Sequence, residues 1–160
     1  MALAYRSTEI FLQPDVKYKS KLVSKFINSL MRKGKKSVSE KVFYDEMNEV
    51  EKKISDIPPI EIFETAVNNV KPLVEVRSKR VGGATYQVPV EVPRQRQLSL
   101  ALRWIIKAAH EKKGRPMYLR LADELVDAYK KQGAAITQRE NTHKMAEANK
   151  AFAHFAWSKF

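Results

Sequence analysis

The sequence predicts a mainly α-helical protein: a single six-helix bundle with a two-stranded β-hairpin that protrudes between the third and fourth helices. Three observations predict this fold. Apolar residues recur at three- and four-residue spacing in six segments, one internal segment alternates with period two, and glycine or proline stands near the boundaries. At 160 residues we expect one domain over 1–160, with an extended arm over 1–16, the hairpin over 74–92 and a tail over 156–160.

Three helices are predicted before the hairpin. Their apolar stripes cover residues 22–31, 42–54 and 60–70, each with the spacing of one helix face. The residues that we expect to start or stop them are Gly34, Ser37 or Ser39 as a cap, Pro58, Pro59 and Pro72.

Three more helices are predicted after the hairpin. The fourth runs from Pro93 over 94–113, the fifth over 117–132, and the sixth follows a capping box through 141–155. The residues that mark these boundaries are Gly114, Pro116, Gly133, and the capping-box pair Thr137 and Glu140.

The segment 74–92 predicts a ribbon. Its apolar residues alternate, which gives each strand one apolar face; they are Val74, Val76, Tyr86, Val88, Val90 and Val92. Gly82 and Gly83 supply the turn, and Pro89 requires an outer edge. A lone hairpin is only marginally stable, so we expect the basic groups near the tip to find another surface and Tyr86 to be available for stacking.

Charge is unevenly distributed along the chain. Thirty Lys and Arg against eighteen Asp and Glu leave +12. Residues 17–36 carry +8, residues 40–64 carry −5, and residues 71–115 carry +8 again. Two separated basic segments, one of them centred on the ribbon, predict a polyanion-binding surface, with the acidic stretch turned away from it. A solvated helix face and an ordinary solvated hairpin are the alternatives.

Arg94 and Arg96 stand in the first turn of the fourth helix, where cations oppose the helix dipole. An external anion is the predicted reason for their position.

No enzymatic, metal or cofactor site is predicted. The chain has no cysteine, which excludes disulfides and thiol chemistry and agrees with a reducing compartment. Its three histidines have no partner at metal-ligand spacing, and we expect the acids Asp123, Glu124 and Asp127 to form an exposed helix face. VGGAT lacks the Gly-Lys-Ser/Thr end of a phosphate loop. No apolar run could span a membrane, and no secretory signal is predicted.

Four motifs carry a resemblance to a known family. GKKS at 34–37, KPLVEVRSKRVGGATYQVPVEV at 71–92, ALRWI at 101–105 and HKMAEANKAFAHF at 143–155 are similar to those of the bacterial or organellar type of small-subunit ribosomal protein seven. The similarity runs from about Pro14 to Trp157.

The resemblance implies a non-enzymatic ribosomal protein, cytoplasmic if bacterial, that binds the 3′ major domain of small-subunit rRNA and nucleates assembly of the subunit head. It implies nearby exit-site tRNA and mRNA, other ribosomal proteins of the head and platform, and no membrane. The rRNA-binding positions that it implies are Lys35, Lys36, Arg77, Lys79, Arg80, Arg94, Arg96, Lys113 and Arg115. Those that match positions near the tRNA are Gly82, Gly83, Asn149 and Lys150.

Two departures from the family pattern concern the chain ends. Only Arg6 precedes Pro14, where members often carry an arginine-rich run, so Lys17, Lys19 and Lys21 are the expected substitutes as rRNA contacts. Ala156 stands where an arginine usually precedes the tryptophan.

An architectural DNA-binding protein with a basic β-arm is the alternative function, although a glycine tip does not suit wedging between base pairs.

Overall fold

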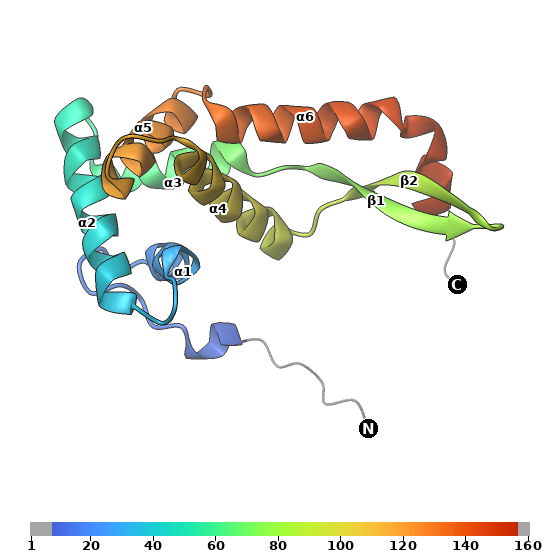
Figure 1. Ribbon diagram of the computed structural model, residues 1–160. Helices are drawn as coiled ribbons and strands as arrows, with labels where there is room; N and C mark the ends of the chain where they lie inside the picture. Colours follow the sequence, from blue (N-terminus) through green and yellow to red (C-terminus); the bar gives the residue numbers. More distant parts are fainter. Residues whose placement is uncertain (1–7, 157–160) are drawn as a thin grey trace.

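The computed structural model describes residues 8–156 and shows a helical body from which a long arm extends (Figure 1). Its α-helices are α1 (Lys21–Leu30), α2 (Lys36–Lys53), α3 (Pro59–Val70), α4 (Arg94–Glu111), α5 (Met117–Tyr129) and α6 (Ala134–Ala148). Two 3-10 helices, η1 (Thr8–Phe11) and η2 (Lys150–Ala156), add to these six within the described residues. The mainly helical class is therefore confirmed, whereas the predicted number of six helices is too low.

The core lies among α1 to α5 and is built on aromatic contacts. Phe26, Phe43 and Phe63 come from α1, α2 and α3, and their ring centroids are 5.3 to 5.6 Å apart. All three side chains are fully buried. Such tilted and edge-to-face pairs contribute about 0.5–1.5 kcal/mol each beyond the burial of their area. The predicted apolar stripes of these helices are confirmed as core faces.

Two predicted helix caps are wrong. α2 begins at Lys36, before both candidate serines, and the Ser39 hydroxyl instead donates to the carbonyl of Ile27 at 2.7 Å. α6 begins at Ala134, so the proposed capping box at Thr137 and Glu140 lies inside the helix.

Glu124 of α5 explains where α6 begins. Its carboxylate accepts a hydrogen bond from the backbone N–H of Ala135 at 2.9 Å, and so replaces a local cap. Gly133 allows this approach because it has φ +91°, and a Cβ there would lie 2.9 Å from the Cβ of Asp127. Glu124 is fully buried, which overturns the expectation that all three acids of α5 are exposed.

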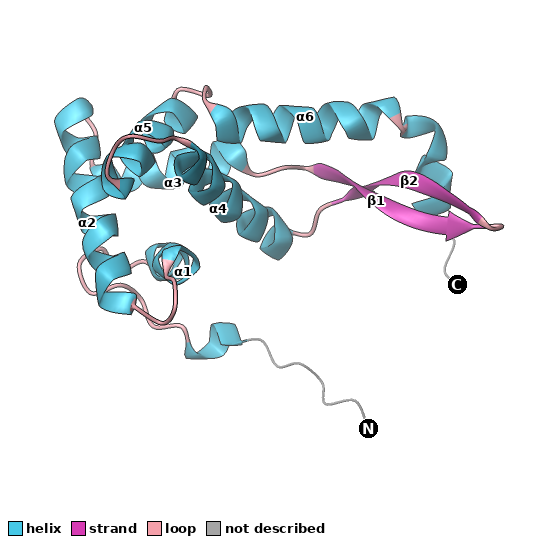
Figure 2. Cartoon of the chain, in the orientation of Figure 1, coloured by secondary structure: helices cyan, strands magenta, loops and turns pink. Residues whose placement is uncertain are grey.

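The hairpin consists of β1 (Val74–Val81) and β2 (Ala84–Glu91), which pair antiparallel between α3 and α4 as predicted (Figure 2). Gly82 and Gly83 have φ +58° and +85°, as a two-residue hairpin turn requires. α6 runs alongside the hairpin and η2 folds against its distal part (Figure 1). We call β1, β2, α6 and η2 together the arm.

Candidate nucleic-acid interface

Three helices of the body begin with cations. Lys21 opens α1, Lys36 opens α2 and Arg94 opens α4, and all three side chains are exposed. None of these first turns contains an acid or a side-chain cap hydrogen bond. Because a helix N-terminus carries partial positive charge and unpaired N–H groups, each of these ends favours an anion.

The loop between α1 and α2 presents Lys35 and Lys36 to solvent. Lys33 and Gly34 both have positive φ, at +52° and +72°, and the N–H of Lys35 donates to the carbonyl of Arg32 at 3.1 Å. This tight turn places the cationic start of α2 on an exposed corner.

Asp15 organises the segment before α1. Its buried carboxylate accepts hydrogen bonds from the N–H groups of Lys17 and Tyr18 at 3.0 and 2.9 Å and from the hydroxyl of Tyr44 at 2.6 Å. The ammonium of Lys17 lies 5.3 and 5.6 Å from the ring centres of Tyr18 and Tyr44, in cation–π contact. Lys19 is exposed at φ +50°. Lys17, Lys19 and Lys21 are thus three exposed cations on the turn that leads into α1 and on its first residue.

The register of the hairpin separates its basic side chains. Arg77 pairs with Val88 and Lys79 with Tyr86, whereas Arg80 pairs with Thr85. Since directly paired residues share a face, Arg77 and Lys79 lie on the face that holds buried Val88, and Arg80 lies on the opposite face. Val74 and Val76 also lie on the face opposite to Val88, so the two predicted apolar stripes are on different sides of the ribbon.

Arg77 and Lys79 have partners within the chain. Arg77 forms an ion pair with Glu75 at 2.8 Å, and the Lys79 ammonium donates to the carbonyl of Phe155 at 2.7 Å. The expectation that these groups must find a partner outside the polypeptide is wrong for both. Arg80 is exposed.

Glu75 also connects the ribbon to α4. Arg96 donates to both of its carboxylate oxygens, at 2.7 and 2.8 Å, and with Arg77 this holds the pKa of Glu75 below its usual range although burial opposes the shift. Arg96 therefore has an internal carboxylate as a partner, which the prediction from the helix dipole did not include. Arg94, two residues earlier, remains exposed.

The loop between α4 and α5 forms a second basic region. Lys113 is exposed, and Arg115 forms an ion pair with Asp123 at 2.7 Å. Lys112 forms ion pairs with Glu124 and Asp127 at 2.9 and 3.6 Å. Of this group, Lys113 has no ion pair with any described carboxylate.

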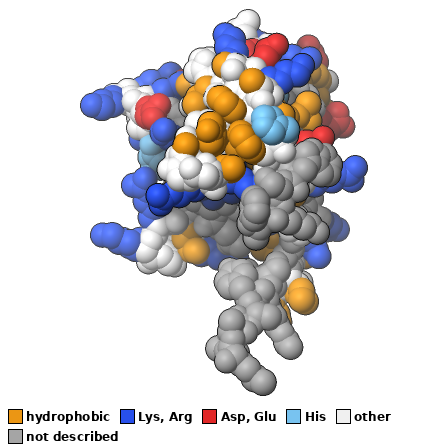
Figure 3. Space-filling model, turned by 90° about the vertical axis from the view of Figure 1, so that its right-hand side faces the viewer, with side chains coloured by type: hydrophobic (Ala, Val, Ile, Leu, Met, Phe, Trp, Pro, Cys, Tyr) orange, Lys and Arg blue, Asp and Glu red, His pale blue; other side chains and the backbone are white. Residues whose placement is uncertain are grey.

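The free end of the arm is apolar as well as basic. Viewed from this end, apolar side chains gather among Lys and Arg side chains (Figure 3). The ring of Tyr86 lies 5.2 and 4.9 Å from those of Phe152 and Phe155, so it has aromatic partners within the chain, which the prediction of stacking on a base did not include. Gly82 and Gly83 are exposed, as is Lys150, while the Asn149 side chain donates to the carbonyl of Met145.

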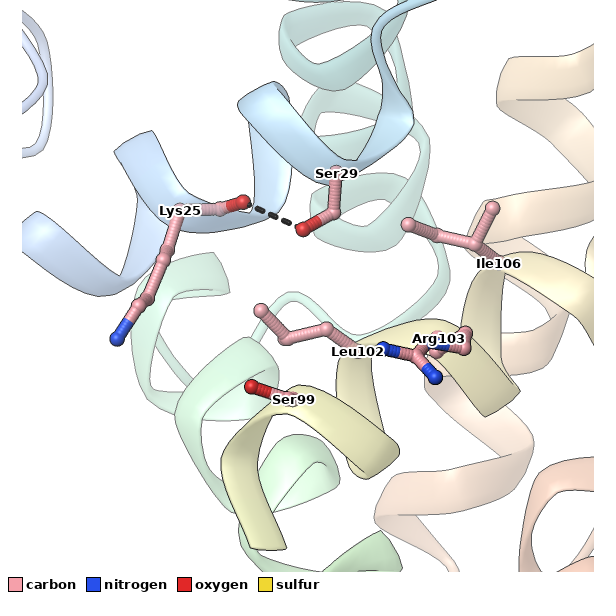
Figure 4. A pocket seen from close by; sticks show the side chains of 6 residues that line it. All are labelled: Lys25, Ser29, Ser99, Leu102, Arg103 and Ile106. Atoms are coloured by element: carbon pink, nitrogen blue, oxygen red, sulfur yellow. Dashed lines mark hydrogen bonds between the residues drawn. The ribbon is translucent and has the colours of Figure 1, made fainter. Parts of the chain in front are cut away.

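A groove between α1 and α4 was missed by the sequence analysis. It has a volume of about 320 Å³ and is lined by Lys25, Ser29, Ser99, Leu102, Arg103 and Ile106 (Figure 4). On α4, Ser99 and Arg103 are one helical turn apart, as are Leu102 and Ile106. The sequence therefore indicates that these residues follow helical spacing on α4, but it does not indicate that α4 contacts α1 there.

Within residues 8–156, no cluster of three or more His, Asp or Glu side chains could hold a metal ion. Across the same residues, no helix has both the length and the apolar character needed to cross a membrane. Two residues of the departures at the chain ends, Arg6 and Trp157, lie outside the described residues.

Comparison with known proteins gives a family match over most of the chain. The sequence profile described as "Ribosomal protein S7p/S5e" matches residues 4–150. A relative from Rhodopirellula baltica is 60% identical over 144 residues, which cover 89% of this chain and 92% of the relative. One from Nitratiruptor sp. is 57% identical over 91% of this chain and 94% of its own length, and one from Francisella tularensis subsp. holarctica is 50% identical over 98% and 100%. All three are named "Small ribosomal subunit protein uS7".

Proposed function

Because the chain belongs to the ribosomal protein S7p/S5e family, in its bacterial type, we propose that its basic surface binds the 3′ major domain of small-subunit rRNA and nucleates assembly of the subunit head. Proteins of this family are structural constituents of the small ribosomal subunit and not enzymes. The single observation that carries the proposal is the group of exposed cations at the N-termini of α1, α2 and α4, since none of those first turns holds an acid.

The cations divide into two roles in this proposal. Those without an ion pair to a described carboxylate neutralise phosphates: Lys17, Lys19, Lys21, Lys35, Lys36, Arg80, Arg94 and Lys113. Arg77, Arg96 and Arg115 form ion pairs within the chain, and Lys79 donates to the carbonyl of Phe155. These four stabilise the conformation of the arm and of the α4–α5 loop that binds RNA. Neutralised phosphates release counterions, which is the main source of affinity in such interfaces.

The arm is the part that we propose to lie beside the exit-site tRNA and the mRNA path. Its end offers a backbone without side chains at Gly82 and Gly83, and Asn149 and Lys150, at the junction of α6 and η2, supply an amide and a charge. Together they allow close approach of a sugar–phosphate backbone. Other ribosomal proteins of the head and platform are the remaining proposed partners.

The salt dependence of RNA binding tests this proposal. Replacement of Lys35 and Lys36 by alanine removes two exposed cations, so we expect the slope of log affinity against log salt to fall by about 0.7–0.9 for each phosphate that is no longer neutralised. Filter binding to isolated 3′ major domain RNA between low and moderate salt measures the slope. Lys52→Ala is the control, because Lys52 is exposed on α2 beside Glu49 in the acidic segment.

An unchanged slope in the Lys35/Lys36 variant would contradict the proposed surface. Equal affinity of the unmodified protein for duplex DNA and for the rRNA domain would favour an architectural DNA-binding role instead.

A further inference from the structure

We propose that the groove between α1 and α4 binds one unpaired RNA nucleotide whose base carries an exocyclic amino group. This inference rests on the proposed function and deepens it, since it specifies what the RNA must present to one part of the surface.

The shape of the groove suits a single base. Its volume of about 320 Å³ lies at the lower end of small-molecule sites, which begin at about 300 Å³. Leu102 and Ile106 form its floor, and more of its exposed lining is apolar than polar. A flat base can cover such a floor only when it is unstacked, because a duplex keeps its bases inside the helix and presents phosphates outward.

The two serines determine which base fits. The Ser29 hydroxyl donates to the carbonyl of Lys25 at 2.9 Å, and the Ser99 hydroxyl donates to the carbonyl of Gln95 at 3.1 Å. A hydroxyl has one proton, so each serine oxygen is left as an acceptor. Adenine and cytosine carry an amino group that donates, whereas uracil presents carbonyl oxygens at the corresponding position. Two acceptors therefore favour an amino-bearing base over uracil.

The charges of the groove suit the phosphates of the same strand. Lys25 and Arg103 stand at opposite ends of it, with the serines between them (Figure 4). None of the described residues that line it is acidic. A strand that runs through the groove would place a phosphate near the exposed Arg103, whose guanidinium can bind it through two donors.

Short RNA probes test the inference on the full chain. We expect single-stranded r(A)6 to shift the NMR methyl signals of Leu102 and Ile106 and to bind about tenfold more tightly than r(U)6, a ratio typical of one or two net hydrogen bonds. The double change Ser29→Ala and Ser99→Ala should remove that preference. Ser55→Ala is the control, because Ser55 is exposed in the acidic segment between α2 and α3.

Two results would overturn the inference. One is equal affinity for r(A)6 and r(U)6, and the other is a shift of the same methyl signals by an A-form RNA duplex. If the 3′ major domain RNA binds with the expected salt slope but does not shift these methyl signals, the nucleotide site is contradicted and the proposed function is not. If that RNA does not bind at all, the proposed function itself is contradicted.

Discussion

Glu46 is a fully buried carboxyl group on the core face of α2, beside Phe43 and Met47. Neither of its oxygens has a hydrogen-bond partner among the described residues, and burial raises its pKa well above the usual value. The acidic stretch over 40–64 was predicted to be an outward face, and Glu46 departs from that prediction. The sequence nevertheless predicts a buried position for Glu46, because it lies one helical turn from Val42 and from Val50 on the predicted apolar stripe.

Replacement of Glu46 should stabilise the protein. Glu46→Met removes an unpaired buried polar group of similar size, so we expect the free energy of unfolding at pH 7 to rise by about 1–3 kcal/mol. The folded state holds the proton of Glu46 more tightly than the unfolded state, so this carboxyl costs stability as pH rises above its unfolded pKa of about 4.3. Urea unfolding at pH 4.5 and 7 should show a smaller gain at the lower pH. A gain that does not depend on pH would mean that packing, and not ionisation, is responsible.

At the scale of elements, the ribbon shows what local patterns leave undetermined. Period-two alternation identified both strands, but it says nothing about which face of one strand joins which face of the other. The two-residue turn decides this: Gly82 and Gly83 force Val81 to pair with Ala84, and from there Arg77 must pair with Val88. The turn was in the sequence, so the split of the cations between faces was predictable. The partners that α6 and η2 provide were not, because those contacts join residues far apart in the chain.

The contact between η2 and the ribbon should depend on Tyr86. Its ring packs against Phe152 and Phe155, so Tyr86→Ala should weaken the attachment of η2 by about 1 kcal/mol or more. We expect faster amide hydrogen exchange in Lys150–Ala156, by about a factor of five to ten, with little change in the core of α1 to α5. Gln87→Ala is the control on the opposite face of the same strand, where Gln87 contacts only Ser78 among the described hydrogen bonds. Protection of η2 that survives Tyr86→Ala would show that the Lys79 hydrogen bond and α6 hold it in place.

At the scale of the whole molecule, two histidines join distant elements, and both must be uncharged to do so. Nε2 of His110 accepts a hydrogen bond from Arg32 at 3.0 Å, which ties α4 to the α1–α2 loop. Nε2 of His143 accepts from the N–H of Leu73 at 3.0 Å, which ties α6 to the root of the ribbon. An arginine and a backbone N–H can only donate, so protonation of either ring removes its role. Burial lowers the pKa of both histidines, and so do Arg32 and Arg120 near His110 and Arg139 near His143.

These two junctions should make the fold sensitive to mild acid. The unfolded histidines take up protons near pH 6.5, whereas the folded ones resist until a lower pH, so the stability that they contribute is lost as pH falls from about 6.5 toward their folded pKa. Glutamine keeps an acceptor but does not titrate in this range. We therefore expect the double variant His110→Gln and His143→Gln to lose less stability between pH 7.5 and 5.5 than the unmodified chain, as measured by urea unfolding. His154→Gln is the control, because that ring is exposed on η2 and its hydrogen bond, to the carbonyl of Ala151, is local. Glu46 is present in the unmodified chain, in the double variant and in the control, so its opposing titration cancels in the comparison. Equal pH dependence of the unfolding free energy in all three proteins would rule out a role of the two junctions in acid sensitivity.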